Sequence, residues 1–176
     1  MEILYLAALK NEVQGLKNFI LTGVGKINAS FVTTDMINKY KPKKIINFGT
    51  AGSTKSNISG LVKCSHFIQR DMDVRGLLDF KLGQTPFDDI NEIKFGDDGL
   101  ICATGDSFVK SKIELNCDVV DMEAYAIAKI CKLKNINFEC YKYISDYTNE
   151  KSHEDWNQNI NKGVKLFLEK FPNCNL

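Results

Sequence analysis

The feature that most constrains the fold of this chain is an alternation between short apolar runs and stretches of helical periodicity. The apolar runs have the length and the branched or aromatic composition of buried β-strands, and they lie at 3–8, 19–22, 45–48, 61–68, 100–104, 119–121 and 138–145. Apolar residues recur every three to four positions at 26–40, 122–133 and 160–171, which predicts helices. Short strands that alternate with helices predict an α/β domain with a largely parallel sheet covered by helices.

The first long predicted helix is expected to bury one face against this sheet. Ile27 and Phe31 lie one helical turn apart. The same spacing continues in Val32, Met36 and Tyr40. This stripe is therefore the expected core-facing side of the helix.

The chain length suits one domain. The 176 residues suffice for a single hydrophobic core, and no repeat, linker or low-complexity tract divides them, so we expect one domain over 1–176. The least regular part is 70–99, which contains several glycines and shows little periodicity. A stretch of that length inside a compact domain is usually functional or mobile, or it contains an element that the pattern hides.

The charge balance argues against polyanionic partners. Lys and Arg total 23 and Asp and Glu total 22, a formal net charge of +1, whereas binding to nucleic acid or an anionic membrane surface needs a basic excess on one face. No apolar run approaches the length of a membrane span, and the first one follows Glu2 rather than a basic signal-peptide segment. We therefore expect neither nucleic acid nor a membrane as a partner, and a cytoplasmic location.

The cysteines, histidines and glycines limit the cofactor chemistry. Among six cysteines there is no C-x-x-C pair and four lie inside apolar runs, so we expect buried thiols in a reducing compartment rather than a disulfide framework, a metal site or a nucleophile. Two histidines, His66 and His153, exclude a multi-histidine metal centre. The glycines at 23–25 lack the third glycine of a dinucleotide-binding loop, because position 28 is Asn, and no phosphate-binding loop is present. We expect no metal and no organic cofactor.

Polar and aromatic residues follow the predicted strands at the points where they end. These positions hold Glu12, the small residues 49–52, Phe108, Glu123, Ser145 and Asp146. Because the carboxyl ends of parallel strands meet at one crevice, we expect the three carboxylates, the small-residue turn and the aromatic ring to converge there. Taken singly, Glu12 fits a helix start and Asp146 a helix cap. Glu123 lies where a strand turns into an apolar helix, and a charge there is costly unless it is paired or used.

The segment VDMEAYAIAKIC (120–131) resembles the V-[DE]-M-E-x-x-A-[IV]-A signature of the purine nucleosidase and phosphorylase superfamily, and more specifically the 5′-methylthioadenosine/S-adenosylhomocysteine nucleosidases. Further segments agree in order along nearly the whole chain: AALKNEV (7–13), TGVGKINAS (22–30), INFGTAGS (46–53), DMDV (71–74), TGDSFV (104–109) and ISDYTNEKSHEDW (144–156). The resemblance implies a three-layer α/β fold with a mixed, mostly parallel central sheet flanked by helices. It also implies a shortened variant, because members carry additional strands between positions 19 and 22.

The resemblance implies a catalytic role for each carboxylate. Glu12 would activate the attacking water, and Asp146 would protonate N7 of the departing purine with Ser145 helping to place it. Glu123, beside Met122, would bind the ribose hydroxyls.

The resemblance also implies a set of substrate-binding residues. Phe108 would stack on the base, the backbone of Val109 would hydrogen-bond to the base edge, and Trp156 would be an aromatic lid residue. The remaining expected binding residues are Thr50, Ala51, Gly52 and Val74.

Together these residues suit the hydrolysis of a purine N-glycosidic bond. The leaving base gains negative charge and the sugar gains positive charge, so an acid at the base and a carboxylate-activated water opposite it stabilise the transition state. Two alternatives remain open: a phosphate-dependent purine nucleoside phosphorylase and a non-catalytic nucleoside-binding protein of the same fold. Phosphorylases of this superfamily usually carry an arginine where this chain has Asn47, which favours hydrolysis. The expected substrate is 5′-methylthioadenosine, S-adenosylhomocysteine, 5′-deoxyadenosine or a futalosine-like nucleoside, and the resemblance implies a homodimer.

Overall fold

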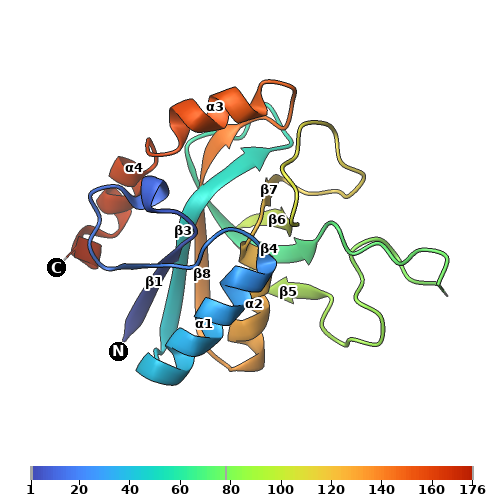
Figure 1. Ribbon diagram of the computed structural model, residues 1–176, viewed down its shortest axis with the longest axis horizontal. Helices are drawn as coiled ribbons and strands as arrows, with labels where there is room; N and C mark the ends of the chain where they lie inside the picture. The colour runs from blue at the N-terminus through green and yellow to red at the C-terminus, as the bar shows by residue number, and fades with distance from the viewer. Residues whose placement is uncertain (1, 78, 176) are drawn as a thin grey trace.

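The chain folds as an α/β protein, as predicted (Figure 1). The computed structural model describes residues 2–77 and 79–175. Its strands are β1 (Ile3–Ala7), β2 (Phe19–Leu21), β3 (Lys44–Ser53), β4 (Leu61–Gln69), β5 (Glu92–Lys94), β6 (Leu100–Thr104), β7 (Val119–Asp121) and β8 (Asn137–Asp146). Its helices are α1 (Lys26–Tyr40), α2 (Ala124–Leu133), α3 (Ser152–Asn159) and α4 (Val164–Lys170), with single 3₁₀ turns η1 (Lys10–Val13) and η2 (Pro172–Asn175).

The strands form one mixed sheet that partly closes on itself. The order is β2-β1-β3-β7-β6-β4-β5, and β8 pairs with both β3 and β4, so that β3, β7, β6, β4 and β8 form a ring. Among the described strands five neighbouring pairs are parallel, whereas β3 with β7, β4 with β5 and β4 with β8 are antiparallel. The long strands β3 and β8 make this closure possible, because each pairs with different partners along its length. The sheet is therefore more mixed than the alternation of elements indicated.

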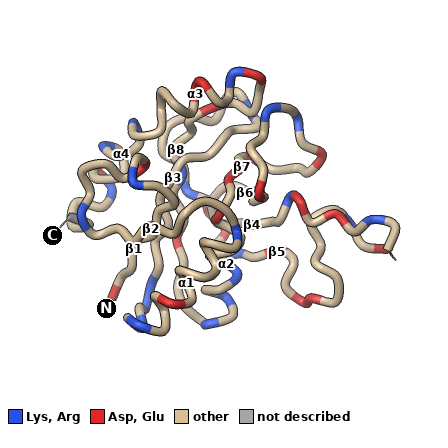
Figure 2. Tube along the Cα trace, in the orientation of Figure 1, with Lys and Arg blue, Asp and Glu red and all other residues tan. Residues whose placement is uncertain are grey.

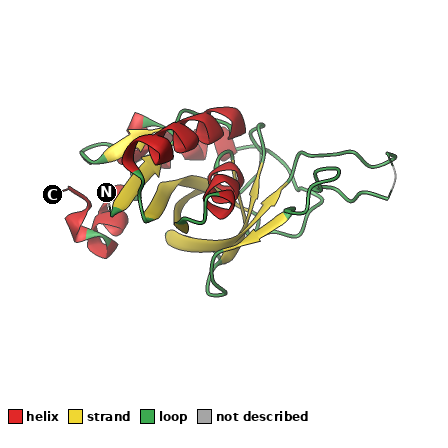
Figure 3. Cartoon of the chain, turned by 90° about the horizontal axis from the view of Figure 1, so that it is seen from below, coloured by secondary structure: helices red, strands yellow, loops and turns green. Residues whose placement is uncertain are grey.

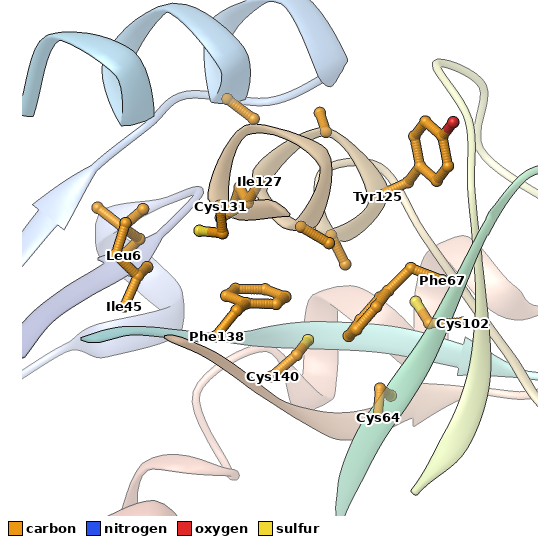
Figure 4. Close-up of a cluster of buried hydrophobic side chains, with 14 of the residues drawn as sticks. Leu6, Ile45, Cys64, Phe67, Cys102, Tyr125, Ile127, Cys131, Phe138 and Cys140 are labelled. Atoms are coloured by element: carbon orange, nitrogen blue, oxygen red, sulfur yellow. The ribbon is translucent and has the colours of Figure 1, made fainter. Parts of the chain in front are cut away.

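Apolar side chains alternate between the two faces of the sheet, and each face has its own core. Ile45 belongs to the core under α1 and α2, whereas its neighbour Ile46 packs in a second core with Phe167 of α4. Figure 4 shows the first core, in which α2 lies over Phe67 and Phe138. The sheet thus carries helices on both faces, and α1 and α2 lie side by side on one of them (Figures 1 and 3).

The helix α1 has the predicted bounds, but only the second half of its predicted stripe faces the core, where Met36 and Tyr40 pack. Ala29, Thr33 and Ile37 are buried, whereas the residues Ile27 and Phe31 are 82% and 73% exposed. Both stripes satisfy the i, i+4 spacing, so periodicity alone did not distinguish them. The buried stripe begins with a small side chain, which suits close packing against α2. The prediction that Ile27 and Phe31 face the core is therefore wrong.

Other differences are local. The irregular segment 70–99 contains β5, and its first part forms a loop that extends away from the body of the molecule (Figures 1 and 3). The expected turn at 49–52 is the last part of β3. The helix predicted at 160–171 is present as the shorter α4, and α3 before it was not predicted. Gly163 between them approaches Tyr143 so closely that a Cβ would lie 2.5 Å from it.

The surface and the thiols follow the sequence-based expectations. All six cysteines are free and buried. Lys and Arg are interspersed with Asp and Glu along the trace rather than gathered on one side (Figure 2). Within the described part of the chain, none of the helices has the length and apolar character needed to cross a bilayer.

Candidate active site

The three predicted carboxylic residues lie around one cavity of about 300 Å³, a size typical of small-molecule sites. Glu12, Glu123 and Asp146 line it together with Thr50, Ala51, Gly52, Phe108, Val109, Met122, Ser145 and Trp156. Val74 is the exception among the predicted residues. It lies in the segment between β4 and β5, and it does not line this cavity.

Glu12 is held by donors on both of its carboxylate oxygens. It lies in η1 directly after β1 and is buried. Its Oε1 accepts hydrogen bonds from the backbone N–H and the hydroxyl of Thr50, each at 2.8 Å. Its Oε2 accepts one from the backbone N–H of Leu9 at 3.0 Å. Charge-assisted donation to both oxygens fixes the plane of the carboxylate at the cavity wall.

Glu123 connects β7 to α2 and is also buried. Its Oε1 accepts a hydrogen bond from the backbone N–H of Gly25 at 3.0 Å. Burial raises the pKa of Glu123 to about 8, and the negative charge of Asp121 adds to this effect, whereas Lys142 and the N–H of Gly25 oppose it. At neutral pH this carboxyl group therefore largely retains its proton, and hydrogen-bond donors from a ligand would favour its ionised form.

A buried ion pair beneath Glu123 joins β7 to β8. Lys142 Nζ lies 2.8 Å from Asp121 Oδ2. Burial by itself raises the pKa of Asp121, but the charge of Lys142 outweighs it and holds that pKa below its ordinary value. The same Asp121 oxygen accepts hydrogen bonds from the backbone N–H groups of Glu123 at 3.2 Å and Ala124 at 2.8 Å. The pair thereby fixes the start of α2 and the backbone that carries Glu123.

Asp146 ends β8, where the pairing of β8 with β3 shifts by one residue and Gly52 lies opposite Asp146. Its Oδ2 accepts a hydrogen bond from the hydroxyl of Ser145 at 3.0 Å, and its Oδ1 accepts one from the backbone N–H of Thr148 at 3.1 Å. The side chain is buried. These contacts leave the carboxyl group at the cavity, held from both sides.

Two glycines of β3 make room for two of the acids. A Cβ at Gly49 would lie 3.0 Å from Glu12 Oε1, and a Cβ at Gly52 would lie 2.7 Å from Asp146 Oδ1. Both distances are shorter than ordinary van der Waals contact. The small-residue segment at the end of β3 is therefore the surface against which Glu12 and Asp146 pack.

Aromatic side chains form another part of the wall. Phe108 is 39% exposed, and the centroid of its ring lies 6.4 Å from that of Trp156 at an interplanar angle of 72°. The guanidinium group of Arg70 supports the segment that carries Phe108, because it donates to the hydroxyl of Ser107 at 3.0 Å and to the carbonyl of Gly105 at 3.0 Å. The ring is thus presented to the cavity by a segment that is tied to the end of β4.

Sequence reasoning missed several groups of this site. Lys142 is a charged residue inside an apolar run, which is the signal that singled out Glu123, and it could have been found in the same way. Arg70 and His153 line the cavity without any sequence pattern that marks them. In the described residues, no cluster of three His, Cys, Asp or Glu side chains has an arrangement that could hold a metal ion.

Curated relatives of this chain include nucleosidases of two bacilli. The 5′-methylthioadenosine/S-adenosylhomocysteine nucleosidase of Bacillus thuringiensis is 28% identical over 189 aligned positions, which cover 88% of this chain and 79% of the relative. The protein of the same name from Bacillus cereus is 29% identical over 176 positions, which cover 81% of this chain and 73% of the relative.

Solved structures from Helicobacter pylori share the fold. A futalosine hydrolase mutant superposes with a TM-score of 0.88 at 19% identity, covering 99% of this chain and 98% of that chain. A 5′-methylthioadenosine/S-adenosylhomocysteine nucleosidase with butyl-thio-DADMe-Immucillin-A superposes with a TM-score of 0.86 at 21% identity, covering 97% of each chain. The sequence model of the phosphorylase superfamily matches residues 12–102, more than half of this chain. The chain therefore belongs to the phosphorylase superfamily.

Proposed function

We propose that this protein hydrolyses the N-glycosidic bond of a purine nucleoside and releases the purine base. The observation that carries this proposal is the lining of one cavity by three buried carboxylic side chains from distant parts of the chain, Glu12, Glu123 and Asp146. A cavity of about 300 Å³ suits a ligand of this size. The similarity to nucleosidases supports the same reaction.

In the proposed reaction, water forms a bond to C1′ while the bond from C1′ to N9 breaks and its electron pair leaves with the purine. Glu12 accepts a proton from the water, and Asp146 donates a proton to N7, so that the base leaves neutral. The donors of Thr50 and Leu9 orient Glu12, and those of Ser145 and Thr148 orient Asp146. The general base thus acts on the attacking water, and the general acid acts on the leaving purine.

Glu123 is the proposed ribose-binding group. A carboxylate accepts hydrogen bonds from two sugar hydroxyls, whereas a protonated carboxyl group has less acceptor capacity. Because burial raises the pKa of Glu123 to about 8, binding of a ribose ring at neutral pH is accompanied by proton release. Phe108 would stack on the purine, the backbone of Val109 would bind its edge, and Trp156 would cover the site.

The proposed substrates are 5′-substituted adenosines, with 5′-methylthioadenosine and S-adenosylhomocysteine first. The names of the bacillar relatives support these two. A futalosine-like nucleoside is a second candidate, because the fold is shared with a futalosine hydrolase. 5′-Deoxyadenosine remains a third.

Hydrolysis is favoured over phosphorolysis by the residues around the cavity. Asn47 is buried in β3, where its amide donates to the carbonyl of Leu6 at 3.2 Å, and it does not line the cavity. Arg70 does line the cavity, but both Nη groups of its guanidinium already donate to Ser107 and Gly105, which leaves only its buried Nε without a hydrogen-bond partner. Phosphate binding generally needs a cationic group that is free to pair with it.

The test is incubation of the protein with 5′-methylthioadenosine in phosphate-free buffer, with free adenine measured by liquid chromatography. Adenine released without phosphate supports hydrolysis. Adenine that appears only after phosphate is added would identify a phosphorylase instead. Binding of the nucleoside without cleavage would identify a non-catalytic nucleoside-binding protein.

We propose that the protein acts as a homodimer, as a single domain and in the cytoplasm. Exposed Ile27 and Phe31 lie one turn apart on α1, and large exposed apolar side chains of this kind are commonly buried in interfaces. Free buried cysteines suit a reducing compartment. Light scattering coupled to size-exclusion chromatography should give the mass of a dimer, and Phe31→Asp should shift it toward a monomer. A monomeric parent protein would contradict this assembly.

A further inference from the structure

We propose that Trp156 is a positioning residue for Glu12 and that it acts through the hydroxyl group of Thr50. This inference rests on the proposed role of Glu12 as the acceptor of a proton from the attacking water. Trp156 Nε1 lies 3.0 Å from Thr50 Oγ1, and Thr50 Oγ1 lies 2.8 Å from Glu12 Oε1. These groups form a continuous chain of hydrogen bonds from α3 to η1.

The direction of both hydrogen bonds follows from the chemistry of the groups. An indole N–H can only donate, and an ionised carboxylate can only accept. The hydroxyl of Thr50 has one proton, so it accepts from Trp156 and donates to Glu12. Without the indole donor, the hydroxyl is free to turn its proton toward another acceptor. Glu12 Oε1 then keeps only the backbone N–H of Thr50.

A second contact on the same face of α3 strengthens the link. Asn159 follows Trp156 by three positions, and its amide donates to the carbonyl of Ser145 at 2.8 Å. Residues three apart lie on one side of a helix. Helix α3 is therefore attached to the cavity wall at two points, one at Thr50 beside Glu12 and one at the residue before Asp146.

This arrangement differs from that of an ordinary aromatic lid. A lid residue needs only a ring to cover the ligand, whereas the chain of hydrogen bonds needs the indole N–H. Trp156 is the only tryptophan in the sequence, and phenylalanine offers a matched substitution that keeps a ring and removes the donor. Trp156→Phe should lower kcat about tenfold, the effect of one hydrogen bond of ordinary strength, and change KM by less than about twofold. Trp156→Ala should raise KM as well, because the ring is lost.

A double-mutant cycle tests whether Trp156 acts through Thr50. Thr50→Val removes the hydroxyl and should lower kcat, whereas Thr50→Ser retains the hydroxyl and should restore most of it. In the Thr50→Val background, Trp156→Phe should have no further effect on kcat, because the link is already broken. An equal loss of kcat from Trp156→Phe in both backgrounds would overturn the inference, and so would a Trp156→Phe variant with unchanged kcat.

A measurement that does not depend on turnover separates this inference from the proposed function. A single tryptophan gives one indole N–H signal in a ¹H–¹⁵N spectrum. That proton should exchange slowly with water in the parent protein and in Thr50→Ser, and rapidly in Thr50→Val. Rapid exchange in a parent protein that hydrolyses nucleosides would overturn the role of Trp156 alone. Slow exchange in a protein that releases no adenine would refute the proposed function and, with it, the role assigned to Trp156.

Discussion

Glu123→Gln should change how the stability of the protein depends on pH. Burial, with the negative charge of Asp121, raises the pKa of Glu123 from 4.5 to about 8. Between these two pH values the native state holds a proton that the unfolded chain has lost. The contribution of Glu123 to the free energy of unfolding of the parent protein therefore falls as pH rises through this interval. Glutamine keeps the shape of the protonated side chain and its acceptor for Gly25, and it does not titrate. The variant should therefore not lose this part of its free energy of unfolding as pH rises.

The size of the effect follows from the two pKa values. Each pH unit between them corresponds to about 1.4 kcal/mol, which gives an upper bound of roughly 5 kcal/mol over the whole interval. Rearrangement and water entry around the ionised group reduce this penalty, so we expect a difference of about 2 to 4 kcal/mol at high pH. Parent and variant should have similar stability near pH 5, and the variant should be the more stable protein near pH 9.

Urea unfolding followed by circular dichroism at a series of pH values measures this difference. Glu139→Gln is a matched control, because Glu139, in β8, is also a glutamate with a shifted pKa, but the shift has the opposite sign. Burial raises its pKa, but Lys44 outweighs this effect and holds the pKa below the ordinary value. The stability difference between that control and the parent should stay constant between about pH 6 and about pH 9. If the difference in free energy of unfolding between Glu123→Gln and the parent is equally independent of pH across this range, the raised pKa and the reasoning built on it are refuted.

Further predictions concern the neighbouring groups. Asp146→Asn should lower the rate of purine release by about a hundredfold to ten thousandfold while the circular dichroism spectrum stays unchanged, because a general acid is lost; undiminished release would remove Asp146 from the mechanism. Gly52→Ala places a Cβ 2.7 Å from Asp146 Oδ1, so it should displace that carboxyl group and reduce kcat far more than it reduces stability. Lys142→Met leaves Asp121 buried without a counter-charge and should lower the free energy of unfolding by roughly 3 to 5 kcal/mol, as measured by urea unfolding, with partial recovery when Asp121→Asn is added. In the parent protein, KM should fall as pH rises toward about 8, because ionised Glu123 accepts hydrogen bonds from the ribose; a KM that rises over this range would contradict its proposed role.

The strand ends were the most informative part of the sequence. Apolar runs predicted most strands to within a few residues, and the residues that follow them include Glu12, Glu123 and Asp146, which meet at one cavity. The strand geometry that brings these residues together is only partly the one expected, because β1, β3 and β8 are parallel but β7 is not parallel to them. Strand β7 runs antiparallel to β3, and the pairing of Val120 with Gly52 brings the start of α2 beside the end of β3. A common edge of parallel strands explains how Glu123 comes beside the segment after β6 that carries Phe108, but not how it comes beside the end of β3.

What the sequence could not predict depends on contacts between distant segments. The two possible stripes of α1 have the same spacing, and only packing against α2 selects Ala29 rather than Ile27 for the core. The closure of the sheet depends on β8 pairing with both β3 and β4, which no local pattern encodes. The requirement for glycine at 49 and 52 becomes visible only when Glu12 and Asp146 are placed against β3.

The most direct test of the account is a crystal structure of the Asp146→Asn variant with 5′-methylthioadenosine bound. The proposed mechanism predicts the purine stacked on Phe108 with N7 beside the side chain at position 146, the ribose hydroxyls hydrogen-bonded to Glu123, and a water molecule between Glu12 and C1′. A nucleoside bound outside this cavity, or one whose ribose is turned away from Glu12 and Glu123, would contradict it.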